Sequence, residues 1–113
     1  MTGNVTYFEV PSTDIEATEK FWGSLFGWNF REGNLPGYSM IDGPTPLGGS
    51  PHNEASKHPR IYFAVPDIDA AVARVRELGG TADNPVTIPS GAFALCTDTQ
   101  GVEFGLSLEP DQS

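Results

Sequence analysis

Two similar stretches of the chain alternate polar with apolar side chains. The first, VTYFEV, begins at Val5, and the second, RIYFAV, begins at Arg60. Successive side chains of a β-strand point to opposite faces of the sheet. We therefore expect Tyr7 and Glu9 on one face of the first strand, and Arg60 and Tyr62 on the corresponding face of the second. These four side chains are the first candidates for a binding site.

The chemistry of these side chains suits a flat ligand with an acidic group. A guanidinium fork beside tyrosine hydroxyls can bind a carboxylate, a phenolate or an enolate. The alternative is that Glu9 and Arg60 pair with each other, since opposite charges that face one cavity commonly meet. The site would then present neutral aromatic and hydroxyl groups.

Four other residues invite a chemical interpretation that we do not adopt. His52 and His58, with Glu54 between them, could bind a metal, but nothing holds their spacing on a helix face. Cys96 lies in an alternating strand with no base beside it in the sequence, so we predict a structural thiol rather than a nucleophile.

A helix follows each of the two polar strands. Asp14 and Asp67 are suitable N-caps, because a carboxylate can accept a free backbone N–H of the first turn. Glycines end both helices. In each helix apolar residues recur at helical spacing, which predicts a core-facing stripe. The stripes are Ile15, Thr18, Trp22 and Leu25, with Phe21 and Phe26 beside them, and Ile68, Ala71, Val72, Val75 and Leu78; Phe21 and Trp22 are predicted to be core residues.

Aligning the two capping aspartates shows an internal repeat, because Leu25 then matches Leu78 and Gly27 matches Gly80. Each half reads strand–helix–strand–strand–strand. The sequence thus predicts an α+β fold of two βαβββ modules, with a curved eight-stranded mixed sheet around a trough and the helices on the outer face. The expected strands are 5–10, 28–31, 38–41, 47–50, 60–65, 81–88 (interrupted at Asn84-Pro85), 92–96 and 102–108, and residues 109–113 are expected to form a tail.

Length and composition indicate one domain, 1–113, with a first module at about 1–50, a linker at 51–59 and a second module at about 60–113. The net charge of −9 argues against a nucleic-acid partner. We expect no membrane partner, because no apolar run is long enough for a span. A single cysteine and no visible secretory signal predict a cytoplasmic protein.

The paired strand–aspartate–helix units, together with the ending DTQGVEFGL, resemble the vicinal oxygen chelate superfamily. This group contains glyoxalases, bleomycin-resistance proteins and extradiol dioxygenases, and the resemblance covers nearly the whole chain. In its metal-dependent members, each module supplies one ligand from its first strand and one from its last. The resemblance also implies a homodimer, since members commonly pair.

The four positions that the resemblance assigns to metal ligands hold residues that do not bind metals well. They fall on Tyr7, on Arg60, on Gly105 and on the segment from Leu47 to Ser50, which contains Gly48 and Gly49. An arginine keeps its proton, glycine has no side chain, and one tyrosine is a poor ligand set. We therefore predict no metal and no other cofactor.

The resemblance implies a small-molecule binding protein, metal-independent and of the glyoxalase/bleomycin-resistance type, with an apolar or aromatic ligand in the trough. The alternatives are a lyase or isomerase that uses Arg60 and a tyrosine, a metal-dependent glyoxalase- or dioxygenase-like enzyme with a displaced site that uses Glu9 or Glu103 and a histidine, and a subunit without a ligand. The predicted ligand-binding residues are Tyr7, Glu9, Trp28, Tyr38, Arg60, Tyr62 and Glu103, with Met40, Phe93 and Cys96 as further candidates for the walls.

Overall fold

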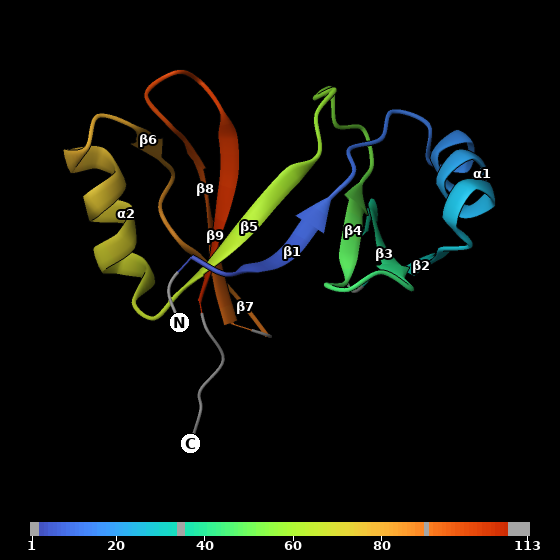
Figure 1. Cartoon of the computed structure of the whole chain (residues 1–113), viewed down its shortest axis with the longest axis horizontal. Helices are drawn as coiled ribbons and strands as arrows, with labels where there is room; N and C mark the ends of the chain where they lie inside the picture. The colour runs from blue at the N-terminus through green and yellow to red at the C-terminus, as the bar shows by residue number, and fades with distance from the viewer. Residues whose placement is uncertain (1–2, 34–35, 90, 109–113) are drawn as a thin grey trace. The chain divides into compact units, whose positions relative to one another are not determined.

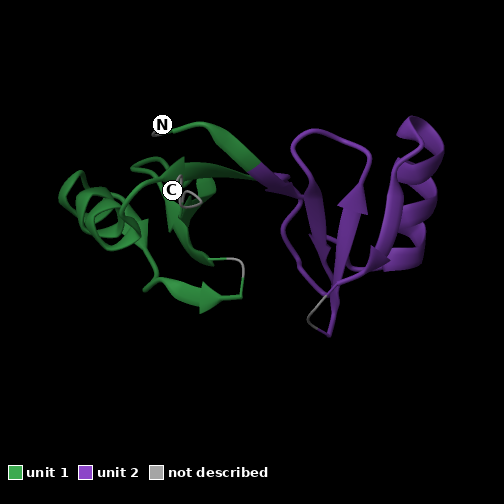
Figure 2. Ribbon diagram, turned by 90° about the horizontal axis from the view of Figure 1, so that it is seen from below, with its two compact units in different colours: residues 1–6, 61–113 green, residues 7–60 purple. Residues whose placement is uncertain are grey.

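The computed structural model describes residues 3–33, 36–89 and 91–108. In this part of the chain it contains two helices and nine strands, which confirms the predicted α+β class. The chain divides into two compact units, unit 1 (Met1–Thr6 and Ile61–Ser113) and unit 2 (Tyr7–Arg60), coloured green and purple in Figure 2. Residues 3–6 therefore group with the second half of the chain, and the predicted tail at 109–113 lies outside the described residues.

Unit 2 forms a four-stranded arrangement with one helix (Figure 1). The strand order is β2-β3-β4-β1, in which β4 runs parallel to β1 and the other neighbours are antiparallel. The parallel partner of β1 is therefore β4, the last strand of the module, and not β2, the strand that directly follows α1. The elements are β1 (Val5–Glu9), α1 (Ile15–Phe26), β2 (Asn29–Glu32), β3 (Tyr38–Asp42) and β4 (Gly48–Pro51).

Unit 1 repeats this plan, with the order β5-β9-β8-β6, β9 parallel to β5, and β7 paired with β8. Helix α2 packs on this unit through Ile68 and Val72, which form a core with Val65, Ala94, Cys96 and Leu106. The elements are β5 (Arg60–Val65), α2 (Ile68–Glu77), β6 (Thr81–Ala82), β7 (Val86–Ile88), β8 (Gly91–Thr97) and β9 (Glu103–Leu108).

The helix boundaries follow from local signals. The Asp14 carboxylate accepts a hydrogen bond from the backbone N–H of Ala17 at 3.2 Å, and Asp67 makes the equivalent bond to Ala70 at 3.0 Å. Gly27 ends α1 in the left-handed conformation, with φ of 74°. Both capping predictions are confirmed.

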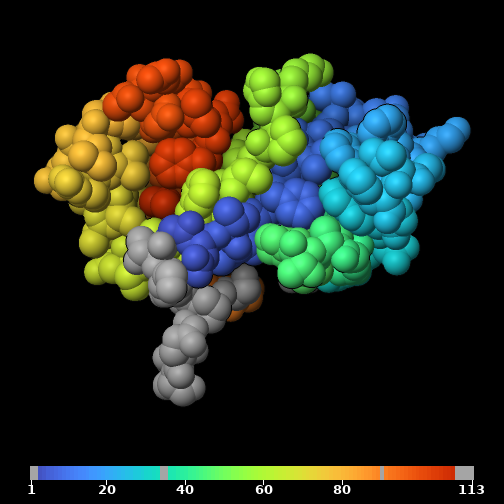
Figure 3. Space-filling model, in the orientation of Figure 1, coloured from blue at the N-terminus to red at the C-terminus, as the bar shows by residue number. Residues whose placement is uncertain are grey.

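The prediction about the packing of α1 is corrected. Phe21 was expected in the core, but 62% of it is exposed, and Leu25 of the predicted stripe is 57% exposed. Figure 3 shows the light-blue surface of α1 uncovered in that view. The predicted interruption of residues 81–88 at Asn84 and Pro85 is confirmed, since two separate strands, β6 and β7, lie on either side of it. Within the described residues, neither helix has the length and apolar character needed to cross a membrane.

Candidate functional site: a tyrosine-rich face of unit 2

Strand register places the polar residues of unit 2 on one face of its sheet. Glu9 lies beside Gly49, and Gly49 lies beside Met40. Tyr7 and Tyr38 are two residues from Glu9 and Met40 and therefore share their face. The opposite face carries Phe8 and Gly48, and helix α1 is on that side, because its Trp22 stacks on Trp28, which contacts Phe8. Helix α1 therefore packs on the face that carries Phe8 and does not cover the face that carries Tyr7 and Tyr38, which we call the tyrosine face.

A chain of hydrogen bonds joins the two tyrosines to Glu9. The hydroxyls of Tyr7 and Tyr38 are 2.6 Å apart, and the Tyr38 hydroxyl donates to Glu9 Oε2 at 2.8 Å. Because the Tyr38 proton is directed at Glu9, the Tyr7 hydroxyl is the donor to Tyr38 in this arrangement. The sulfur of Met40 lies 3.6 Å from the Tyr7 hydroxyl. Sequence positions about thirty residues apart thus meet at one point.

Arg60 continues this chain on the other side of Glu9. Its Nη1 donates to Glu9 Oε1 at 2.7 Å, and its Nη2 donates to Glu54 Oε1 at 3.0 Å. The side chains of Arg60 and Glu9 are each only 9% exposed. The ion pair that the sequence left as one of two alternatives is therefore present, with Glu54 as a second carboxylate. We call Tyr7, Glu9, Tyr38, Glu54 and Arg60 the polar cluster.

Burial keeps the two tyrosines of the cluster protonated. It raises the pKa of the Tyr38 hydroxyl far above its ordinary value of 10.0, and the nearby Glu9 carboxylate and Tyr7 raise it further. Burial also raises the pKa of Tyr7, and Glu9 adds to this. Both hydroxyls are therefore neutral hydrogen-bonding groups at physiological pH, and neither is suited to act as a base.

The raised pKa values predict a specific response to alkaline pH. Stability from a group whose pKa is higher in the folded state is fully present below the unfolded pKa, here near 10, and is lost as pH rises above it. Tyr38→Phe should cost about 1–3 kcal/mol at pH 7, because it removes a hydrogen bond to a charged group. Above pH 10 the stability of the wild type should fall more steeply than that of the variant. Urea unfolding at both pH values measures this, and equal slopes would contradict it.

Glycines give tyrosine rings the space that they occupy in both units. A Cβ on Gly49 would overlap the hydroxyls of Tyr7 and Tyr38. In unit 1, a Cβ on Gly105 would overlap the ring of Tyr62, which is 5% exposed. Only glycine lets these rings lie directly on the backbone. Each unit therefore has a strand glycine that makes room for tyrosine side chains.

Comparison with known proteins identifies the family. The family model of the glyoxalase-like domain matches residues 7–107, nearly the whole chain. The chain belongs to the glyoxalase-like domain family. This confirms the resemblance to the vicinal oxygen chelate superfamily.

Individual relatives agree with this membership. CFP32 of Mycobacterium tuberculosis, whose name marks it provisionally as a glyoxylase, is 31% identical over 117 residues, which is 92% of this chain and 45% of that protein. The anthracycline biosynthesis protein DnrV of Streptomyces peucetius is 30% identical over 92% of this chain and 41% of its own length. The chain thus spans less than half of these two relatives.

A solved structure shows the same fold. The hypothetical protein BH1468 from Bacillus halodurans C-125 superposes with a TM-score of 0.71, at 17% identity, over 98% of this chain and 97% of that one. At this identity the likeness concerns the fold alone.

The metal site implied by the family resemblance does not fit this glyoxalase-like domain. Gly105 is at the position of one last-strand ligand, and Gly49 lies in the segment that corresponds to the other; both are covered by tyrosine side chains, so no ligand side chain fits on either glycine. Arg60 is bound by two carboxylates, and a guanidinium cannot coordinate a cation. In the described part of the chain, no three His, Cys, Asp or Glu side chains are grouped to hold a metal.

The remaining predicted site residues lie on the helix side of unit 2 or belong to unit 1. Trp28 packs on the helix side, with ring centroids 5.6 Å from both Phe8 and Trp22. Tyr62 belongs to unit 1, where its ring meets Phe93 edge-on at 6.4 Å. Glu103 is an exposed residue of β9, beside Thr97.

The other chemical candidates are structural or lie on loops. Cys96 is buried in the core under α2, so its suggested place in a ligand-binding wall is wrong. Burial raises the pKa of its thiol, as expected of a structural cysteine. His52 Nε2 lies 2.8 Å from the Ser39 hydroxyl, and the His58 side chain is exposed.

Sequence reasoning missed the role of Glu54, which it weighed only as a metal ligand between two histidines. Glu54 lies in the predicted linker and has no periodic pattern around it. Only its charge could have suggested its role, since Arg60 is the nearest arginine along the chain.

Proposed function

We propose that this glyoxalase-like domain is a metal-independent binding protein that holds an apolar or aromatic small molecule on the tyrosine face of unit 2. The observation that carries the proposal is that Arg60 is held by Glu9 and Glu54 while two protonated tyrosines and Met40 share the same face. Such a surface offers rings, a thioether and hydroxyls to a ligand.

The charges of this face favour a neutral or cationic ligand over an anion. Both terminal nitrogens of Arg60 are used by carboxylates, so its charge is already balanced. The two carboxylates outnumber the single arginine, and the whole chain carries a net charge of −9. A ligand with a carboxylate or a phenolate would suit an unpaired arginine. Because Arg60 is paired, we do not propose a ligand of that class for this face.

The same contacts favour binding over the enzyme alternatives. A metal-free lyase or isomerase would need Arg60 or a tyrosine to act on the substrate. Here Arg60 is engaged twice, and the pKa values of Tyr7 and Tyr38 are raised rather than lowered. Neither tyrosine therefore has the lowered pKa that a general base at neutral pH requires.

The ligand can be sought with an anthracycline aglycone, because one relative is named for anthracycline biosynthesis. This is a flat, uncharged polycyclic aromatic molecule, which suits a surface of rings and hydroxyls. We expect saturable binding with one molecule per chain, the same with or without EDTA, and no stoichiometric metal in elemental analysis. EDTA should also leave the melting temperature unchanged, because no metal-binding energy is linked to folding.

Tyr38→Ala should weaken aglycone binding by about tenfold or more, since it removes a ring from the centre of the face. Tyr38→Phe should keep most of the affinity and so serves as the matched control. The proposal fails if the aglycone does not saturate the protein, if Tyr38→Ala binds it like the wild type, or if one equivalent of a divalent metal accompanies the native chain.

The proposal also includes a cytoplasmic homodimer. The exposed apolar side chains of α1 support pairing, since Phe21, Leu25 and Phe26 are 62, 57 and 55% exposed. Light scattering should give about twice the chain mass of 12.1 kDa at micromolar concentration. Phe21→Glu should shift the mass toward the monomer. A monomeric wild type would contradict this part of the proposal.

A further inference from the structure

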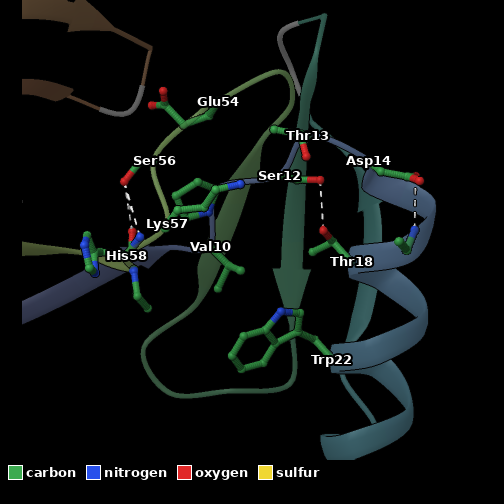
Figure 4. Close-up of a pocket in the computed structure, with 13 residues that line it drawn as sticks. Val10, Ser12, Thr13, Asp14, Thr18, Trp22, Glu54, Ser56, Lys57 and His58 are labelled. Carbon is green, nitrogen blue, oxygen red and sulfur yellow. Dashed lines mark hydrogen bonds between the residues drawn. The ribbon is translucent and has the colours of Figure 1, made fainter.

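Unit 2 contains a cavity on the helix side of its sheet, and Glu54 is the one member of the polar cluster that lines it. It has a volume of about 290 Å³ and lies between the first turns of α1 and the segment 54–59 (Figure 4). Pockets for drug-sized ligands start at about 300 Å³, so this cavity suits a molecule of about one ring. Its lining includes Val10, Ser12, Thr18, Trp22, Lys57 and His58.

The inner wall of the cavity is apolar and firmly built. Val10 is 7% exposed and directly follows β1, two residues after Phe8. The Trp22 ring stacks on Trp28 with an interplanar angle of 7°, which holds its orientation. Ser12, only 3% exposed, accepts a hydrogen bond from the Thr18 hydroxyl at 2.9 Å. A planar ring can pack against such a wall.

Three side chains that line the cavity carry hydrogen-bond donors: Trp22, Lys57 and His58. In the part of the chain that the structure describes, the Lys57 ammonium, the His58 ring and the Trp22 indole N–H have no hydrogen-bond or ion-pair partner. In Figure 4 the helix carries Trp22, and the facing segment carries Lys57 and His58.

The two acids of the lining, by contrast, are already used. Asp14 caps α1 through the N–H of Ala17, and Glu54 binds Arg60 at 3.0 Å. Lys57 is one of two lysines in a chain with a net charge of −9, and among the described residues no carboxylate is paired with it.

We propose that this cavity binds a small molecule with one aromatic ring and one carboxylate. The ring would pack on Val10 and Trp22, and the carboxylate would accept hydrogen bonds from Lys57, with His58 beside it. A carboxylate supplies the acceptor that these donors lack, and hydrogen bonds to charged groups are the stronger ones. This site is distinct from the tyrosine face, and its ligand class has the opposite charge preference.

Phenylacetate is the probe, titrated into the full chain labelled with ¹⁵N. The two tryptophans give two indole N–H signals, and Trp22→Phe assigns the one in the cavity. We expect a saturable shift of the Trp22 signal with a Kd at or below about 1 mM. Phenylacetamide, which has the same shape without the charge, should bind about tenfold more weakly.

Lys57→Gln should weaken phenylacetate binding by about tenfold or more. Lys20→Gln is the matched control, because it removes the same charge from α1 outside this cavity and should leave the affinity unchanged. Tyr38→Ala should also bind phenylacetate normally, so that a failure of this site and a failure of the proposed function are distinguishable. The inference is overturned if the Trp22 signal does not saturate, or if Lys57→Gln has no effect, or if Lys20→Gln has the same effect as Lys57→Gln.

Discussion

Replacing Arg60 by alanine is expected to lower the free energy of unfolding by about 3–5 kcal/mol. The change leaves the Glu9 carboxylate, 9% exposed, without the cation that lies 2.7 Å from it, and it also removes the partner of Glu54. An unpaired buried charge is costly because it can be neither solvated nor balanced. The melting temperature should fall on the order of 10 °C or more.

The chain provides a matched control for this prediction. Arg31 pairs with Asp42 at 2.6 Å, but the two side chains are 55 and 37% exposed. Arg31→Ala should therefore cost no more than about 1 kcal/mol. Equal costs for Arg31→Ala and Arg60→Ala would show that burial of the Arg60 pair does not matter.

A second variant keeps the test informative if Arg60→Ala does not fold. Arg60→Met with Glu9→Gln removes both buried charges at once while keeping similar volumes. A buried ion pair replaced by uncharged residues often costs little, so this double variant should be more stable than Arg60→Ala. A double variant that is less stable would contradict the ion-pair explanation.

Replacing Gly105 by alanine is expected to destabilise the protein by about 1–3 kcal/mol, although it adds only one methyl group. The new Cβ would overlap the ring of Tyr62, which is buried and has Phe93 on its edge. The ring cannot move far in a close-packed interior. Urea unfolding of the wild type and the variant measures the cost.

A double-mutant cycle with Tyr62→Ala gives this prediction its control. Tyr62→Ala alone should cost about 3–5 kcal/mol, because it leaves a cavity. In that background Gly105→Ala should be close to neutral, since the overlapping ring is gone. The coupling between the two positions should reach about 1–3 kcal/mol. Additive costs would mean that Tyr62 is not the reason for glycine at position 105.

Local signals in the amino-acid sequence are enough to define most of the elements. Asp14 and Asp67 mark the helix starts, and Gly27 marks a helix end, because caps and left-handed glycines depend on neighbouring backbone groups. Alternation in VTYFEV placed Tyr7 and Glu9 on one face, since the period of a strand is a property of the chain alone. The repeat and the ending also identified the family.

Which distant residues meet depends on the tertiary structure. Arg60 and Glu9 are 51 positions apart, and whether they pair depends on how separate elements are brought together. Periodicity predicted the apolar stripe of α1 but not how much of it a neighbour covers, which is why the expectation of a buried Phe21 was wrong. Glu54 has no local pattern at all.

Gly49 and Gly105 depend on both kinds of information, the amino-acid sequence and the tertiary structure. The family resemblance assigned metal ligands to Gly105 and to the segment containing Gly49, and the sequence alone shows that glycine offers no side chain to bind a metal. That Tyr62 fills the space at Gly105, and that Tyr7 and Tyr38 fill the space at Gly49, required the structure. Tyr7, Tyr38 and Tyr62 belong to three different strands, β1, β3 and β5. The register between neighbouring strands determines which backbone atoms each ring contacts.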